Sequence, residues 1–139
     1  ADGFRVRVFG RGWDEVPAMA AVCDGALDPA ELAGAYSSAA LVVDDSALHA
    51  RPYGAVNARV FDALACGALV ATNDTQGAAE LFGGRLPTWQ DADSLREHAA
   101  AARDDPERAG GRAGELRAEV LAAHTYEHRA RELLALLGW

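Results

Sequence analysis

YGAVNARVFDALACGALVATN, residues 53–73, is the stretch of this chain that decides the fold. Its first half carries apolar residues at helical spacing, which predicts an amphipathic helix over residues 57–66. The apolar face of that helix consists of Val56, Val60, Phe61 and Leu64. The apolar run at residues 69–72 predicts a buried strand directly after the helix. A helix that leads into a buried strand is the connecting unit of a parallel sheet.

The rest of the chain alternates strands and helices in the same way. Apolar runs predict strands at residues 4–9, 20–23, 41–43, 69–72 and, at an edge, 86–89. Caps, prolines and apolar spacing predict helices at residues 29–36, 57–66, 106–123 and 126–137, a short helix ending at 82, and one capped by Asp93 that ends near 102. This alternation predicts an α/β fold with a parallel sheet and helices on both faces.

Composition and charge restrict the class of protein. A length of 139 residues predicts a single domain that covers the whole chain. The net charge of −8 argues against nucleic acid and against an anionic membrane surface as partners. No apolar run approaches the roughly 18 residues of a transmembrane segment, and no signal peptide is evident. Cys23 and Cys66 lie far apart, so we expect a cytoplasmic, reducing location.

The chain contains no lysine, and this absence removes whole classes of chemistry. A Walker-type phosphate site, a Schiff base and a phosphorelay receiver each require a lysine. Any phosphate bound by this chain must therefore be held by arginine, by backbone N–H groups or by the N-termini of helices.

Polar residues gather where the predicted strands end, the edge at which parallel α/β sheets bind ligands. Asp44-Asp45 follows one strand, and Asn73, Gln76 and Gly77 follow the next. The aspartates resemble the acidic pocket of receivers, but acids that are solvated or cap a turn are favoured. His49, in the loop after these aspartates, is a candidate proton shuttle, with an exposed loop histidine as the equal alternative.

The sharpest group of candidates precedes and opens the central helix. Gly54 lets the backbone approach a ligand closely, and the helix that begins near Asn57 offers free N–H groups to an anion. Arg59 can contact phosphate, and Asp62 can accept hydrogen bonds from ribose hydroxyls. The alternative is a surface ion pair between Arg59 and Asp62, three residues apart on the helix.

Two further motifs favour structural interpretations. Gly10-x-Gly12 begins like a dinucleotide fingerprint, but Glu15 stands where a third glycine belongs, so a turn after a strand is favoured. His124 and His128 in HTYEH lie four residues apart and could share a metal, but no third ligand is evident. A helix junction capped by Thr125 is favoured, and we expect no metal site.

Six segments in a fixed order carry a family resemblance. They are VFGRGW at residues 8–13, ELAGAYSSAALVV at 31–43, NARVFDALACGALVATND at 57–74, ELFGG at 80–84, WQDADSLREH at 89–98 and HTYEHRARELL at 124–134. Together they resemble the C-terminal domain of GT-B-fold glycosyltransferases. Within the group 1 transferases, the CgeB-like spore-maturation group is the most similar.

The resemblance implies a Rossmann-like domain that holds the nucleotide-diphosphate part of an activated sugar, with no cofactor and no metal. It places the family's donor-side carboxylate on Asp62, in contact with the ribose. A second glutamate of many relatives falls on Gly54, so a two-glutamate mechanism is not supported. The expected donor-binding residues are Gly54, Asn57, Arg59, Asp62, Asn73, Gln76 and Gly77.

The sequence therefore predicts the donor-binding domain of a glycosyltransferase of the hexosyltransferase type. We expect it to be a fragment of a longer two-domain enzyme whose N-terminal acceptor domain is missing, and to be inactive alone. The alternative is a degenerate, non-catalytic transferase-like module used for protein contacts, because the glutamate is lost at Gly54.

Overall fold

The computed structural model describes residues 3–139. By their contacts the residues form two compact units, one that ends at Ala35 and a larger one over Tyr36–Trp139. That residues 1–139 act as one donor-binding domain stays a prediction.

The smaller unit contains little regular structure. Val8 and Cys23 form an isolated parallel bridge, and the 3-10 helix η1 covers Ala20–Val22. The strand predicted at residues 4–9 is thus reduced to one bridge, and the strand predicted at 20–23 is wrong over its first three residues. A single pair of short strands buries too little apolar surface to extend, and Val6 is 55% exposed.

A second 3-10 helix, η2 (Pro29–Glu31), leads into α1 (Leu32–Ser37). The Asp28 carboxylate begins this segment by accepting a hydrogen bond from the Ala30 N–H at 2.8 Å. The helix predicted at residues 29–36 is therefore present, with a 3-10 first turn.

The larger unit is built on a parallel sheet. Strands β1 (Val42–Asp44) and β2 (Val70–Thr72) pair in register, with Asp44 opposite Thr72. Thr72 also bridges Thr88 in parallel, so the predicted edge strand at residues 86–89 is present as a single bridge. The parallel α/β character is confirmed, although the strands are short.

The helices of the larger unit lie close to their predicted positions, apart from the short 3-10 helix η3, which falls in a segment predicted to be a loop. They are η3 (Arg51–Tyr53), α2 (Ala58–Ala65), α3 (Thr75–Phe82), α4 (Ala92–Asp104), α5 (Pro106–Ala123) and α6 (Tyr126–Leu136). The cap predicted at Asp93 is wrong, because Asp91 accepts the Ser94 N–H at 2.8 Å and forms a capping box. Asp93 lies in the first turn and pairs with Arg96 instead.

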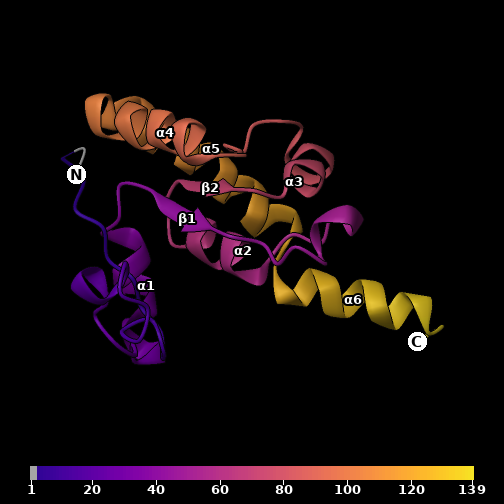
Figure 1. The fold of residues 1–139 in the computed structure, drawn as a ribbon. Helices are drawn as coiled ribbons and strands as arrows, with labels where there is room; N and C mark the ends of the chain where they lie inside the picture. Colours follow the sequence, from indigo (N-terminus) through magenta and orange to yellow (C-terminus); the bar gives the residue numbers. More distant parts are fainter. Residues whose placement is uncertain (1–2) are drawn as a thin grey trace. The chain divides into compact units, whose positions relative to one another are not determined.

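The core lies where α2, β2, α3 and α5 meet, and Figure 1 shows α2 beside the two strands. Its largest buried side chains are Val60, Leu64, Val70, Phe82, Leu86 and Leu116. All three residues of β2 are buried, whereas Val43 of β1 is 46% exposed. Coverage of both sheet faces by helices therefore stays a prediction.

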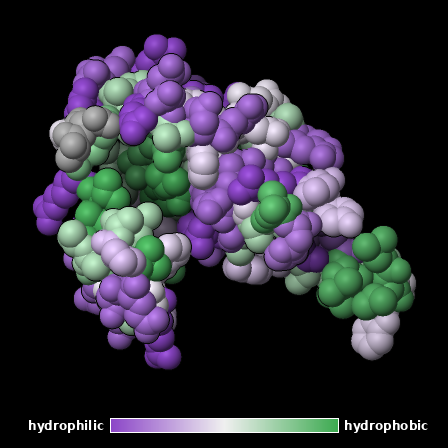
Figure 2. Space-filling view, viewed as in Figure 1, coloured by the Kyte–Doolittle hydropathy of each residue, from purple (hydrophilic) through white to green (hydrophobic). Residues whose placement is uncertain are grey.

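The end of α6 carries an apolar surface, seen as a green patch in Figure 2. The exposed residues are Leu133, Leu134, Leu136, Leu137 and Trp139. Across residues 3–139, no helix is both long enough and apolar enough to cross a membrane.

The junction between α5 and α6 is organised around His124. Its ring lies 5.7 Å from the ring centre of Phe61 and 5.8 Å from that of Phe82. The Arg129 guanidinium lies 2.7 Å from Nδ1, and because arginine only donates, this nitrogen accepts and carries no proton. Thr125 caps α6, so the interpretation of HTYEH as a capped helix junction is confirmed.

We expect core and surface leucines to respond very differently to truncation. Leu116→Ala removes a fully buried side chain at the contact of α5 with α2, and should lower the free energy of unfolding by about 2–5 kcal/mol. Leu136→Ala, at a position that is 85% exposed, should change it by no more than about 0.5 kcal/mol. Urea unfolding of both variants measures the difference, and equal losses would contradict the assigned core.

We expect acid to weaken the His124 junction. Burial, and secondly the charge of Arg129, lower the pKa of His124 from its usual 6.5, so the unfolded chain binds a proton more readily than the native one. This contribution to stability is complete above the unfolded pKa and is lost as the pH falls below it. Unfolding free energies at pH 7.5 and 5.5 should differ less for His124→Asn than for the wild type. An unchanged difference would contradict this assignment.

Candidate functional site

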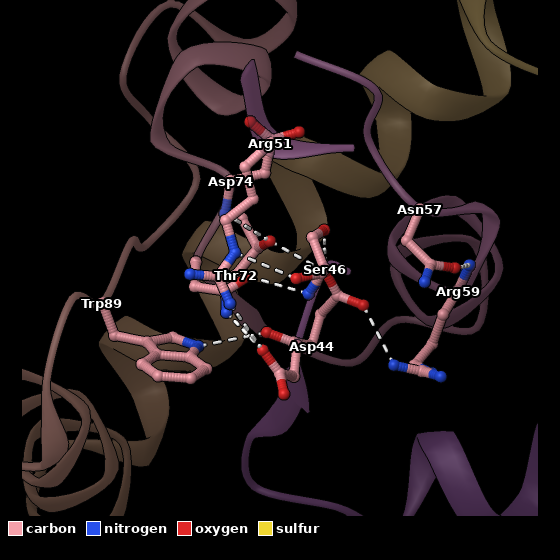
Figure 3. A network of polar contacts seen from close by, with 10 residues as sticks. Asp44, Ser46, Arg51, Asn57, Arg59, Thr72, Asp74 and Trp89 are labelled. Carbon is pink, nitrogen blue, oxygen red and sulfur yellow. Dashed lines mark hydrogen bonds and ion pairs between the residues drawn. The ribbon is translucent and has the colours of Figure 1, made fainter. Parts of the chain in front are cut away.

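A fully buried carboxylate lies at the carboxyl edge of the sheet. Asp44 ends β1 and, through the register, lies opposite Thr72 at the end of β2. Its Oδ2 accepts hydrogen bonds from Thr72 Oγ1 at 2.8 Å and from Ser46 Oγ at 3.2 Å. Its Oδ1 accepts one from Arg59 Nη1 at 3.0 Å (Figure 3). The expectation that this acid is solvated or caps a turn is therefore wrong for Asp44.

A third segment fixes the same strand end. The indole Nε1 of Trp89 donates to the main-chain oxygen of Asp44 at 3.1 Å, as Figure 3 shows. The Trp89 N–H donates to the Thr72 carbonyl at 2.9 Å. The backbone of Asp44 is thus held by Trp89, and its carboxylate by β2, the following loop and α2.

The loop after β1 is braced against the end of β2. Asn73 Oδ1 accepts the Ser46 N–H at 2.7 Å, and its Nδ2 donates to the exposed Asp45. Arg51 donates to the Ser46 carbonyl at 2.9 Å and to Asp45 at 3.1 Å. The side chain of Asn73, predicted to contact a ligand, is engaged at both ends in this brace. His49 lies exposed in the same loop.

The first turn of α3 touches the loop before α2. Asp74 caps α3 by accepting the Gly77 N–H at 2.9 Å, while its other oxygen is buried with no hydrogen-bond partner among the described residues. A Cβ on Gly77 would lie 2.5 Å from Val56 Cγ2 and 2.7 Å from the Gly54 carbonyl oxygen. Gly54 is left-handed (φ 60°). The structure thus brings the predicted residues Gly54 and Gly77 together by direct backbone contact.

The remaining predicted residues of α3 and α2 lie nearby. Gln76 is exposed on α3 and donates to Glu80 at 2.9 Å. Asn57 caps α2 by accepting the Arg59 N–H at 3.0 Å. Arg59 forms its ion pair with Asp44 rather than with Asp62, the alternative considered from the sequence.

Tyr36, near the end of α1, is a site residue that the sequence did not indicate. Burial raises the pKa of its phenol, the charges of Asp62 and Asp44 raise it further, and the charge of Arg59 opposes them. The charges of Arg59 and Asp62 act on this phenol, so Tyr36 belongs to the same polar region. The raised pKa keeps the phenol protonated, so it can donate a hydrogen bond.

The sequence also offered the Gly10-x-Gly12 turn as a dinucleotide site and the pair His124 and His128 as metal ligands. The Gly10-x-Gly12 turn is followed by irregular chain and not by the helix that a dinucleotide fingerprint opens, so the turn interpretation is confirmed. Across residues 3–139, no three His, Cys, Asp or Glu side chains cluster closely enough to hold a metal ion.

Two signals could have identified Asp44 and Thr72. Both are polar residues at the last position of an apolar strand, and strands joined by one helix are paired in parallel. The register that places these side chains against each other depends on long-range packing, which a single sequence does not reveal.

We expect the contact between Gly54 and Gly77 to restrict substitution. Gly77→Ala should lower the free energy of unfolding by about 1–3 kcal/mol, because the new methyl group would overlap Val56 and the Gly54 carbonyl. Gly111→Ala in α5, where a methyl group meets nothing within 4 Å, should raise it by about 0.5–1 kcal/mol. Thermal unfolding of the two variants tests the contrast, and stabilisation by both would refute the contact.

Comparison with known proteins identifies the family of this chain. No curated protein and no solved structure matches the chain significantly. A family described as glycosyl transferase-like matches residues 1–135, nearly the whole sequence. The chain therefore belongs to the glycosyl transferase-like family.

Proposed function

We propose that this chain binds the nucleotide-diphosphate part of an activated sugar for a glycosyltransferase of the hexosyltransferase type. The observation that carries the proposal is a half-exposed arginine, Arg59, held by a buried carboxylate at the carboxyl edge of a parallel sheet. Parallel α/β sheets bind ligands at this edge. Family membership supplies the reaction class.

Arg59 is the proposed contact to the diphosphate. Its guanidinium has five N–H donors, and within the described residues one hydrogen bond from its side chain is present, to Asp44. The side chain is 43% exposed, and its remaining donors are proposed to bind two phosphate oxygens. The helix dipole at the start of α2 adds a favourable field for an anion.

Asp62 is the proposed contact to the ribose. It lies three residues after Arg59 on α2, so both side chains project from one side of the helix. A carboxylate accepts hydrogen bonds from vicinal hydroxyl groups, and the protonated phenol of Tyr36 is a proposed donor in the same region. Gln76 and the backbone around Gly54 and Gly77 form the proposed opposite wall.

In the transfer, an acceptor oxygen attacks the anomeric carbon, and the bond from that carbon to the diphosphate oxygen breaks. The nucleoside diphosphate leaves with the electron pair, and Arg59 stabilises the charge that develops on it. Positioning supplies the rest of the proposed catalysis, without a cofactor or a metal. The acceptor site, and the catalytic base that takes the proton from the acceptor hydroxyl group, are proposed to lie in an N-terminal partner domain. His49 is a candidate for this base from the present chain.

A non-catalytic interaction module is the second candidate. Gly54 packs against α3, so that a Cβ added to it would lie 3.4 Å from Gln76 Cγ and 3.4 Å from the Gly77 nitrogen. A Cβ there would make only ordinary van der Waals contacts, but the left-handed backbone of Gly54 (φ 60°) disfavours a glutamate at this position. A chain that binds no nucleotide would favour this candidate.

We expect nucleotide titrations to separate the two candidates. Titration of the labelled chain with UDP, GDP, ADP, TDP and their sugar conjugates should shift resonances of Arg59, Asp62 and their neighbours. Arg59→Ala should weaken diphosphate binding roughly 10- to 100-fold, since a charge-assisted hydrogen bond contributes about 1.5–3 kcal/mol. Asp62→Ala should weaken nucleotides while leaving inorganic pyrophosphate unaffected.

Arg131→Ala is the matched control for a lost arginine. Arg131 forms an exposed ion pair with Glu127 on α6, so its loss should leave every affinity unchanged. Equal losses from Arg59→Ala and Arg131→Ala would indicate non-specific attraction and count against the proposed site.

A further inference from the structure

We propose that Asp44 is a positioning residue that aims the Arg59 guanidinium at the diphosphate of the donor. This inference rests on the proposed function and deepens it. Asp44 touches no ligand itself, because it is fully buried beneath the end of the sheet. It acts through the single hydrogen bond and ion pair that it forms with Arg59.

The two oxygens of Asp44 have separate tasks. Oδ2 is clamped by two hydroxyl groups, those of Thr72 on β2 and Ser46 on the following loop. Oδ1 is left to accept from Arg59 Nη1. Since the main-chain oxygen of Asp44 is also bound, by Trp89, the position of Oδ1 is fixed from three segments (Figure 3).

A fixed Oδ1 restricts a side chain that is otherwise mobile. Arginine has many rotamers when exposed, and ordering it on binding costs affinity. The guanidinium is planar, so one hydrogen bond from Nη1 to a fixed oxygen limits the directions of its other N–H groups. Arg59 is therefore ordered before the ligand arrives, which is preorganisation.

The buried charge explains why this pairing persists. A desolvated carboxylate is costly unless a cation and hydrogen bonds compensate it. Arg59 is the only cation within ion-pair distance of Asp44 among the described residues. The guanidinium of Arg51 instead pairs with Asp45 and donates to the backbone carbonyl of Ser46.

A carboxylate that competes with the ligand for Arg59 would change the diphosphate affinity in the opposite direction from one that positions it. If the carboxylate merely competed with phosphate for Arg59, removing its charge would release a full positive charge and tighten diphosphate binding. Positioning predicts that removal weakens binding. Asp44→Asn separates these roles because the amide keeps the size of the side chain and one acceptor oxygen while removing the charge.

A double-mutant cycle in the full chain tests the inference. Affinities for inorganic pyrophosphate and for the tightest-binding nucleoside diphosphate are measured with wild type, Asp44→Asn, Arg59→Ala and the double variant. Asp44→Asn should weaken both ligands about 5- to 20-fold in the presence of Arg59, and should have no further effect in its absence. The Nε–Hε signal of Arg59 should broaden or shift in Asp44→Asn without ligand.

Two further variants test whether the loss of affinity is specific to the contact between Asp44 and Arg59. Thr72→Val removes one clamp on Oδ2 but keeps the charge, so it should give a smaller loss that also disappears in the Arg59→Ala background. This variant carries the test if Asp44→Asn does not fold. Glu127→Gln, which breaks the exposed ion pair with Arg131, should leave binding unchanged.

The outcomes distinguish the two proposals. Tighter binding by Asp44→Asn, or an equal loss with and without Arg59, overturns the positioning role and leaves the donor site intact. Absence of pyrophosphate and nucleotide binding in the wild type overturns the proposed function, and the positioning role with it.

Discussion

The fully buried carboxylate at the end of β1 is the constraint on which the rest of this edge depends. Asp44 is fully buried, so each of its oxygens needs a partner from the protein. Those partners come from the end of β2, from the loop after β1 and from the second residue of α2. One side chain therefore ties the end of β1 to β2 and to α2, which lie 28 and 15 residues away in the sequence. The ion pair with Arg59 also orients the first turn of α2, the element that packs against α5 in the core.

A second constraint, the lack of space between Gly54 and Gly77, acts on the same edge from the other side. The loop before α2 reaches the first turn of α3 at a distance that a methyl group would prevent. The loop after β1 is braced by Asn73 and Arg51. Both loops are thereby fixed relative to the strand ends. A binding site assembled from such loops is more rigid than loop composition alone would suggest, and rigid polar groups lose little entropy when a ligand binds.

Sequence reasoning succeeded where the determinants were local. The helices at α2, α5 and α6 follow from apolar spacing, a proline and a capping threonine, all of which act within one or two turns. It failed where neighbouring residues competed for one role or where the partner lay far away in the sequence. Asp93 and Asp91 are equally good caps in isolation, and the position of Ser94 at the third residue of α4 selects Asp91. Asp44 appeared solvated because its burial depends on Thr72 and Trp89, 28 and 45 residues away.

Charge balance places a limit on how this edge can recognise an anion. The chain has a net charge of −8 and no lysine, and the arginine best placed for a ligand is already paired with a carboxylate. Long-range attraction of a diphosphate is therefore weak. Recognition must come from short-range hydrogen bonds whose donors are fixed in direction, and such bonds are strong only when they are not shared with water. An ordered guanidinium backed by a buried carboxylate meets that requirement better than a free arginine, which carries more net charge but no fixed direction.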